Sequence, residues 1–328
     1  MIDFVDPETK AKLRLLPDGS AYVSKGGNSF PIKDGIPIFS VEIYTENFGD
    51  QWNDFPLTQI DSSNIDKVSE ERLVQTFGFT LDKLAGKSIL EVGSGAGRFT
   101  EVLLRHGAMV YSCDASNAII ANSRNNKDKG IGVFFQASVF NLPLPPRKFD
   151  VVFCIGVIQH LPDASKGISC LAECVKPGGS LFIDHYRWQI FRRLAPRYLI
   201  GRPITSRLST SVNRNIAKAF VNIWWPLRFI FNYEILRKIA TTLSPVAPIA
   251  YYKRMYKGAS DEKLKELAVL DTNDFISARY DKGLTRQTLK KILKSTNCSS
   301  CEVLTNHELA DQYGTLRAAG LVARASYD

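Results

Sequence analysis

The sequence has few cysteines and no long apolar run, and these two deficits remove several classes of protein. Six cysteines in 328 residues are too few for a disulfide scaffold, so we expect a reducing, cytoplasmic compartment. The longest apolar stretches, around residues 220–230 and 239–252, are interrupted by prolines or an arginine. Both fall short of the roughly 18–20 apolar residues that cross a bilayer. Residues 1–6 are acidic and lack the pattern of a secretory leader. We therefore expect a globular protein without a transmembrane helix.

Acidic residues are almost missing from one part of the chain. The net charge is +9, yet residues 186–258 contain 14 Lys or Arg and a single acid, Glu234. The rest of the chain has 28 basic and 32 acidic residues. A positive charge usually indicates nucleic acid or a membrane surface as partner. Here only residues 186–258, which we call the basic segment, support that interpretation.

Apolar runs alternate with helical periodicity over residues 70–183. Strands that are apolar on both faces, separated by helices of 9–13 residues, predict a parallel sheet covered on both sides. The expected strands are 88–92, 109–113, 133–136, 151–155 and 180–183, followed after the basic segment by a closing pair at 301–305 and 321–325. The sequence thus predicts an α/β fold with a seven-stranded, mostly parallel, doubly wound sheet. A small β unit precedes the sheet, and a helical insertion precedes its last strands.

This pattern divides the chain into five parts. They are a small β unit (1–40), a leading segment with helices (41–87), a core that contains the first five sheet strands (88–185), a basic, aromatic, helical insertion (186–270), and a C-terminal helix with the closing strand pair (271–328). Forty residues bury little apolar surface alone, so we expect the first part to dock on the core.

A glycine-rich loop is the strongest chemical signal. Residues 91–97 read Glu-x-Gly-x-Gly-x-Gly between an apolar strand and a helix, where backbone turns tightly and approaches a ligand. Seventeen residues beyond Gly97, the second strand ends at Asp114, whose carboxylate is placed to bind ribose hydroxyls or, alternatively, to cap a helix. Nicotinamide-binding loops usually read G-x-G-x-x-G. Because Glu91 repels phosphate and suits an amine and a sulfonium, the pattern favours S-adenosylmethionine.

Four motifs in order make residues 88–183 resemble the Rossmann-like class I S-adenosylmethionine-dependent methyltransferases, in their small-molecule, type 11-like branch. They are the glycine loop, Asp114, the run FDVVFCIGVIQHLPD at 149–163, and CVKPGGSL at 174–181. The resemblance implies that S-adenosylmethionine is bound by Glu91, Gly93, Ser94, Gly95, Gly97, Asp114, Ala115, Ala137, Ser138, Val139 and Ile155. Ser138 departs from the acid that family members often carry, and a hydroxyl is a weaker acceptor for the adenine amino group.

Three shorter stretches carry further resemblances. Residues 44–52 and 270–281 resemble segments of a narrower methyltransferase group that fold over cofactor or substrate, although plain packing explains them equally well. Residues 30–37 resemble the hallmark of a small methyltransferase-activator domain, here without zinc-binding cysteines. Arg72, on the helix before the first strand, is a candidate partner for the cofactor carboxylate or a plain surface charge.

Methyl transfer to a hydroxyl requires a group that takes the proton. Ligands of open α/β sheets bind at the carboxyl ends of the strands, so the candidates are His160 after the fourth strand and Asp184 with His185 after the fifth. A neutral imidazole makes His160 the strongest of these, with a structural role as the alternative. Cys298 and Cys301 have the spacing of half a zinc site, but four ligands are needed, and we expect no metal.

The basic segment admits three interpretations. It is a cap that binds an anionic or apolar acceptor, or a patch that holds the protein peripherally at the inner face of the membrane, or an RNA-binding surface. Its aromatics come in apolar runs, which disfavours nucleic acid. We expect a methyltransferase that modifies a small-molecule, glycan or lipid-linked acceptor, with O-methylation favoured. The alternatives are an RNA methyltransferase and a catalytically silent protein that binds the cofactor or activates a partner.

Overall fold

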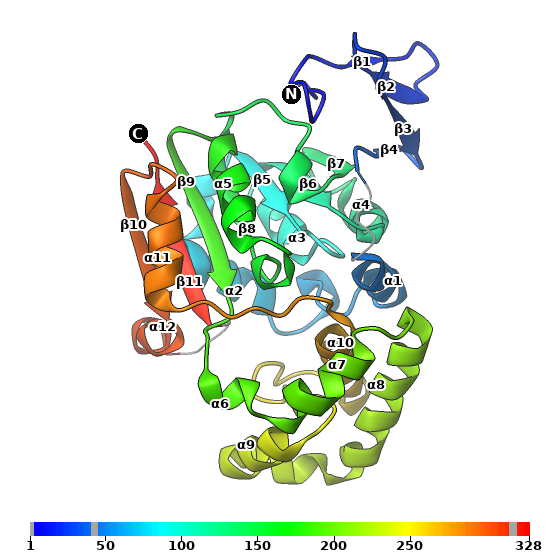
Figure 1. The fold of residues 1–328 in the computed structure, drawn as a ribbon, viewed down its shortest axis with the longest axis vertical. Coiled ribbons are helices and arrows are strands. Elements are labelled where there is room, and N and C mark those ends of the chain that lie inside the picture. The colour runs from blue at the N-terminus through cyan, green and yellow to red at the C-terminus, as the bar shows by residue number, and fades with distance from the viewer. Residues whose placement is uncertain (1–2, 41–44, 315–319) are drawn as a thin grey trace.

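A computed structural model describes residues 3–40, 45–314 and 320–328 (Figure 1). Its centre is a seven-stranded sheet in the order β10-β11-β9-β8-β5-β6-β7. The strands are β5 (Ser88–Val92), β6 (Met109–Asp114), β7 (Gly132–Gln136), β8 (Phe149–Cys154), β9 (Val175–His185), β10 (Ser300–Thr305) and β11 (Leu321–Ser326). Strands β5 to β9 pair with one another in parallel. Strand β11 pairs antiparallel with both of its neighbours, β9 and β10. The predicted fold class is confirmed.

Helices cover both faces of the sheet because the strands are apolar on both sides. One core packs Leu90, Val92 and Val152 against Leu171 and Leu289. A second core lies on the other face of the sheet, where Ile89, Val151 and Phe153 of the strands pack against Leu73 and Val102 of two helices. The helices are α2 (Val68–Phe77), α3 (Arg98–Arg105), α4 (Ala118–Asn126), α5 (Ala164–Cys174) and α11 (Arg286–Lys294). Helices α5 and α11 therefore lie on one face, and α2 and α3 on the other (Figure 1).

Local signals set where several helices begin and end. Helix α5 starts where the Asp163 carboxylate accepts a hydrogen bond from the Lys166 N–H at 2.9 Å. Helix α2 ends at Gly78, whose left-handed φ of 82° is accessible to glycine without strain. A capping box between Thr305 and Glu308 starts α12 (Asn306–Tyr313). This helix between the closing strands was not predicted.

The N-terminal residues form a separate four-stranded antiparallel sheet, with strands β1 (Arg14–Leu15), β2 (Ala21–Val23), β3 (Ser29–Lys33) and β4 (Ile36–Pro37). This sheet continues into the core, because the Phe39 N–H donates to the Gln136 carbonyl of β7 at 2.9 Å. The Phe4 ring packs at 5.2 Å from the Phe135 ring. The resemblance to an activator domain rests on sequence alone and stays a prediction.

The insertion between β9 and α11 is helical and lies to one side of the sheet (Figure 1). It contains α6 (Ile190–Arg193), η6 (Arg197–Gly201), α7 (Arg202–Thr205), α8 (Thr210–Trp224), η7 (Trp225–Asn232), α9 (Glu234–Leu243) and α10 (Asp261–Ser277). Its own core joins α8 and α10 through Ala217, Val221, Leu264 and Ala268. The boundary expected at residue 270 is wrong, since α10 runs through it.

The remaining elements connect these parts. Helix α1 (Glu46–Asp54) packs against α4 and α10. Short 3₁₀ turns are η2 (Asp61–Ser63), η3 (Leu81–Leu84), η4 (Val139–Asn141) and η5 (Ile158–His160). Within the described ranges, no helix has both the length and the apolarity needed to span a bilayer.

Candidate active site

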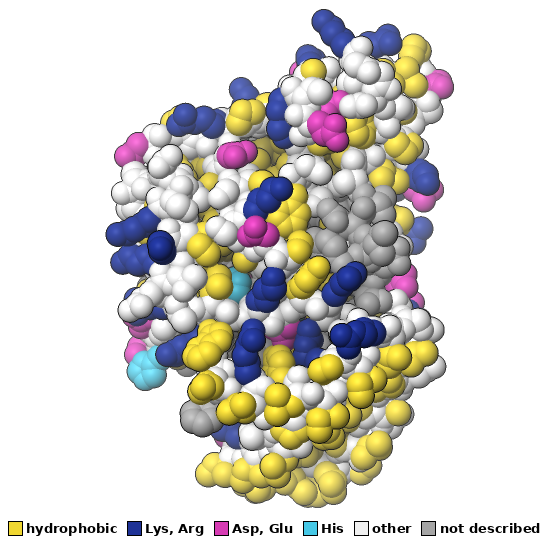
Figure 2. All heavy atoms as spheres, viewed as in Figure 1, with side chains coloured by type: hydrophobic (Ala, Val, Ile, Leu, Met, Phe, Trp, Pro, Cys, Tyr) yellow, Lys and Arg dark blue, Asp and Glu magenta, His cyan; other side chains and the backbone are white. Residues whose placement is uncertain are grey.

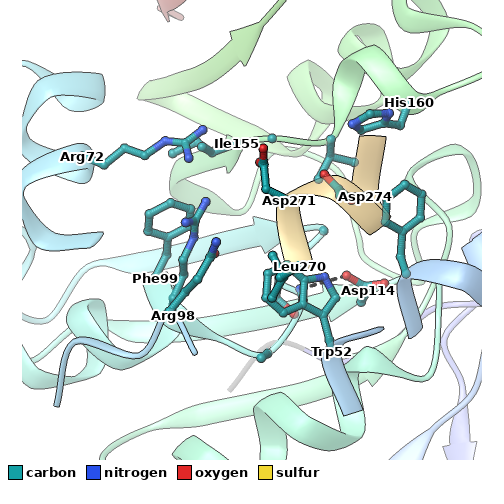
Figure 3. A pocket seen from close by; sticks show the side chains of 18 of the residues that line it. Trp52, Arg72, Arg98, Phe99, Asp114, Ile155, His160, Leu270, Asp271 and Asp274 are labelled. Carbon is teal, nitrogen blue, oxygen red and sulfur yellow. Dashed lines mark hydrogen bonds between the residues drawn. The ribbon is translucent and has the colours of Figure 1, made fainter. Parts of the chain in front are cut away.

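A pocket of about 410 Å³ opens at the carboxyl ends of β5, β6 and β8 (Figure 3). The sheet contributes the loop after β5, Asp114 at the end of β6, and Ile155 after β8. Helices α1 and α10 supply the wall opposite the sheet, with Trp52 and Asp271. Parallel strands that carry polar groups and glycines at one edge commonly build ligand sites of this kind.

The glycine loop is shaped so that side chains are excluded from it. Gly93, Gly95 and Gly97 have φ values of +80°, +54° and +86°, in the region that favours glycine. A Cβ on Gly95 would lie 3.0 Å from the Trp52 ring, and one on Gly97 would lie 2.0 Å from Asn122 Oδ1. The loop is therefore held from below by α4 and faces Trp52 from above.

Asp114 ties the end of β6 to the loop. One carboxylate oxygen accepts from the Gly95 N–H at 2.9 Å, and the other accepts from the N–H and hydroxyl of Ser116 at 2.9 and 2.7 Å. Burial raises the pKa of Asp114, although these hydrogen bonds oppose the shift. Asp114 does not cap the following helix, whose N-cap is Asn117. It ties the loop and lines the pocket, and its contact with ribose stays a prediction.

Glu91 lies beneath the loop and does not line the pocket. Its carboxylate accepts hydrogen bonds from the hydroxyls of Thr100 and Ser112, and Asn122 donates to both hydroxyls at 2.9 and 2.8 Å. Asn126 completes this network by donating to the Gly97 carbonyl at 2.9 Å. Burial raises the pKa of Glu91 to about 7. The side chain of Glu91 is turned into the polar network under the loop and does not line the pocket, so its expected place beside the cofactor amine stays a prediction.

The end of the pocket opposite Asp114 is basic (Figure 3). Arg72 and Arg98 lie 5.8 and 4.4 Å from the Phe99 ring centroid. Arg72 is paired with Asp184 at 2.5 Å. In the described part of the chain, no carboxylate forms an ion pair with Arg98. Burial, with Arg72 nearby, lowers the pKa of Arg98 to about 10, so it remains a cation at neutral pH and suits an anionic ligand group.

His160 lines the pocket, and its two ring nitrogens differ in their contacts. Nδ1 lies 2.9 Å from the Tyr280 carbonyl oxygen, which only accepts, so we assign the proton of the neutral ring to Nδ1. Nε2 then carries a lone pair, and it has no hydrogen-bond partner among the residues that the structure describes. The ring packs against Phe48 at 5.4 Å. Asp274 lies on the same wall (Figure 3), and burial raises its pKa despite the nearby imidazole.

The structure brings most of the expected residues together. Those that line the pocket are Gly93, Ser94, Gly95, Asp114, Ala115, Ala137, Val139, Ile155, His160 and Arg72. Those that do not are Glu91, Gly97, Ser138, Asp184 and His185. The side chain of Ser138 is turned to cap η4 by accepting from the Phe140 N–H.

Asp184 and His185 lie within β9, not after it, and both are buried. Asp184 accepts from Arg72 and from the Gly156 N–H, both at 2.5 Å. His185 Nδ1 bonds the Tyr186 carbonyl at 3.0 Å. Neither side chain lines the pocket, so their expected role as proton acceptors for a substrate stays a prediction that the pocket does not support.

Several lining residues were not named individually from the sequence. Arg98 is one of them, although its position directly after the glycine loop was a signal available in the sequence. Asp271, Asp274 and Trp52 fall in the two stretches expected to cover the ligand, and the structure places all three on the pocket. The first of those stretches begins at Tyr44, which lies outside the described residues. Across 3–40, 45–314 and 320–328, no three His, Cys, Asp or Glu side chains gather in a way that holds a metal.

The core of the chain is similar to known proteins. Residues 90–183 match the family model described as a methyltransferase domain. The ubiquinone biosynthesis O-methyltransferase of Coxiella burnetii is 34% identical over 103 residues, which cover 31% of this chain and 44% of that protein. The protein of the same name from Azotobacter vinelandii is 29% identical over 155 residues, covering 46% and 62%. The chain thus spans about half the length of these curated relatives.

A solved structure, magnesium protoporphyrin IX methyltransferase from Synechocystis, aligns with 88% of this chain and 89% of its own at 15% identity and a TM-score of 0.41. Residues 90–183 match a methyltransferase domain, and they contain the glycine loop and Asp114 within a doubly wound sheet of Rossmann-like order.

Proposed function

We propose that this protein is an S-adenosylmethionine-dependent methyltransferase that methylates a hydroxyl of an apolar small-molecule acceptor. The observation that carries the proposal is a single pocket lined by the glycine loop, Asp114 and His160. The matched family domain and relatives named as O-methyltransferases support it.

The residues present fit the cofactor. Three glycines with positive φ leave the loop open to close approach, and Asp114 at one end suits ribose hydroxyls. Ala137 and Val139 line the same end and suit the adenine edge. At the other end, the unpaired Arg98 suits the carboxylate of the cofactor's methionine part. An amino acid joined to a nucleoside carries its carboxylate at the end away from the ribose, as this arrangement requires. When bound, S-adenosylmethionine supplies an electrophilic methyl group.

The chain then has to orient the acceptor and remove its proton. His160 Nε2 accepts the hydroxyl proton, while the hydrogen bond from Nδ1 to the Tyr280 carbonyl keeps the ring in the required tautomer. Walls formed by α10 and by Trp52 restrict water around the reacting groups. In the proposed reaction the acceptor oxygen gains the methyl group and the imidazole gains the proton.

The acceptor side of the pocket favours apolar molecules. The lining of the pocket includes Leu161, Tyr186, Tyr252, Met255 and Leu267, together with the carboxylates of Asp271 and Asp274. A lipid-linked or aromatic alcohol matches these walls better than a bare glycan, whose many hydroxyls need polar partners. We place the reaction in the cytoplasm, in keeping with six cysteines that form no disulfide.

Calorimetric titration with S-adenosylmethionine tests the assignment. We expect binding that Asp114→Ala weakens about tenfold or more, while the exposed turn variant Asp18→Ala leaves it unchanged. Absence of binding overturns the methyltransferase assignment. Binding without transfer of labelled methyl to lipid, quinone or glycan extracts favours a cofactor-binding protein without catalysis, and transfer to RNA alone assigns an RNA methyltransferase.

A further inference from the structure

We propose that the helical insertion docks this protein on the surface of an anionic lipid bilayer. The contact surface is formed by the outward faces of α6, α8, η7 and α9, which we call the docking face. The proposal stands apart from the chemistry of the pocket, and it rests on the proposed function only where it names the source of the acceptor.

Exposed apolar side chains are concentrated on this one part of the molecule. Among the described residues, 19 large apolar side chains are exposed, and 15 of them lie between Trp188 and Leu243. Figure 2 shows hydrophobic side chains covering the end of the molecule formed by the insertion. Continuous apolar surface on this scale marks an interaction site rather than ordinary exposure.

Helix α9 gives the clearest case. None of its ten residues is buried, although half of its sequence is apolar. Ile235, Ile239 and Leu243 are 73%, 51% and 68% exposed, and their spacing of four places them along one face of the helix. Because more than half of each of these three side chains is exposed, the apolar character of this face favours a partner outside the described chain.

The charge of the segment selects the kind of partner. Residues 186–258 carry 14 basic side chains and one acid. Some of the basic residues are structural: Arg197 and Arg202 are buried and bond backbone carbonyls. Others are exposed, namely Arg187, Arg193, Arg207, Lys218, Lys238, Arg254 and Lys257. Figure 2 shows a row of Lys and Arg side chains between the apolar end and the rest of the molecule.

An anionic bilayer satisfies both observations together. Lipid headgroups pair with Lys and Arg, and the region just below them accepts Ile, Leu, Phe and Trp side chains. A second copy of the same face would oppose like charges across a symmetric interface. RNA offers phosphates but no apolar interior for aliphatic side chains such as those of α9.

The docking face and the pocket belong to the same insertion. Tyr186, Tyr252, Met255 and Tyr256 of the insertion line the pocket, while α9 lies on its outer side (Figure 1). A bilayer bound to the outer side would therefore lie near the wall that an apolar acceptor must pass. This arrangement supplies the lipid-linked acceptor of the proposed reaction directly from the membrane.

Vesicle flotation with the full chain tests the proposal. We use vesicles of phosphatidylcholine with and without phosphatidylglycerol at low and high salt. We expect flotation with the anionic vesicles, reduced by salt. The variant Ile235→Ser/Ile239→Ser/Leu243→Ser should lower the fraction floated at least tenfold. The matched variant Leu15→Ser/Leu57→Ser/Ile131→Ser, which changes exposed apolar residues outside the insertion, should float like the wild type.

A second pair of variants tests the charge. Arg193→Gln/Arg207→Gln/Lys238→Gln should weaken binding to anionic vesicles about fivefold or more, and Lys25→Gln/Lys33→Gln on the N-terminal sheet should not. Circular dichroism and cofactor titration confirm that each variant is folded and that its pocket is intact, which separates failure of docking from failure of the proposed function.

Three results would overturn the proposal. The first is a wild-type chain that binds no vesicle, and the second is an equal response of the α9 variant and its matched control. The third is a different occupant of the face. That occupant is a second copy of the chain if sedimentation shows a dimer that the α9 serine variant abolishes. It is RNA if the wild-type chain binds an oligonucleotide but no vesicle, and the glutamine variant loses that binding.

Discussion

Arg72 and Asp184 form a buried ion pair, with guanidinium Nη2 and carboxylate Oδ2 2.5 Å apart. The other carboxylate oxygen accepts from the Gly156 N–H at 2.5 Å. Asp184 therefore links β9 to the loop after β8 and holds Arg72 at the wall of the pocket. The basic end of the pocket consequently has one neutralised cation, Arg72, and one unpaired cation, Arg98.

Asp184→Asn should destabilise the fold because it leaves the largely buried Arg72 without an anion. Breaking such a pair costs about 3–5 kcal/mol, so the free energy of unfolding in urea should fall by that amount. Asp3→Asn, which breaks the exposed pair with Lys12, serves as the control and should change nothing measurable. A variant with full stability but no turnover would instead assign Asp184 to the chemistry.

Gly95→Ala should weaken binding of S-adenosylmethionine about tenfold or more. The new Cβ combines a positive φ with a contact 3.0 Å from the Trp52 ring, and it narrows the loop where the cofactor has to approach. Gly19→Ala has a similar φ of +71° but open space around it, so it reports the backbone strain alone, about 1–3 kcal/mol. Calorimetric titration compares the two, and equal affinities would show that the loop does not contact the cofactor.

Glu91→Gln should change how stability depends on pH. Burial raises the pKa of Glu91 to about 7 from 4.5, so the folded protein keeps this proton while the unfolded chain loses it. The contribution of the protonated Glu91 carboxyl to the free energy of unfolding is therefore complete below about pH 4.5, and it is lost as the pH rises to about 7. The amide does not titrate, so the variant should gain about 1–3 kcal/mol relative to the wild type between pH 5 and pH 8.

Urea unfolding at the two pH values measures that difference, with Glu302→Gln on the exposed side of β10 as the control. A constant difference between wild type and Glu91→Gln across this range would contradict a protonated Glu91. Loss of cofactor binding without any change in stability would place the carboxylate at the ligand after all.

His160→Ala should reduce turnover about 10²–10⁴-fold with little change in cofactor affinity, because the imidazole removes a proton and does not hold the cofactor. Transfer of labelled methyl to the acceptor fraction of a membrane extract gives the rate, and titration gives the affinity. His307→Ala, a change at an exposed side chain, should leave both unchanged. Turnover equal to that of the wild type would remove His160 from the reaction.

The strands of the central sheet were predictable because a parallel strand buried on both faces is a run of apolar residues. Every expected strand of that sheet is present, with ends within a few residues for most of them. Strand β9 is the exception: it begins at Val175, through the Lys-Pro-Gly-Gly turn that marks a break in the sequence. Helix α10 was missed as one unit because its buried residues are distributed around several partners, so no single apolar face appears in its sequence.

Site residues were predictable from the sequence where their role depends on backbone conformation or on a position at the end of a strand. The glycines of the loop, Asp114 and His160 belong to this kind, and they line the pocket or shape it. Glu91 and Ser138 do not line the pocket, because the direction of a side chain on a buried strand or turn depends on its neighbours. Thr100 and Ser112 attract Glu91 beneath the loop.

The sequence by itself determined the order of strands and helices, the loop and acid that define a cofactor site, and a segment of one charge sign. These follow from periodicity, glycine content and composition, which are local properties. Only the tertiary structure decided that Asp184 neutralises Arg72 while Arg98 stays unpaired, since an ion pair joins residues 112 positions apart. It also decided that the apolar side of α9 faces outward, because whether a helix face is buried depends on what packs against it and not on the helix itself.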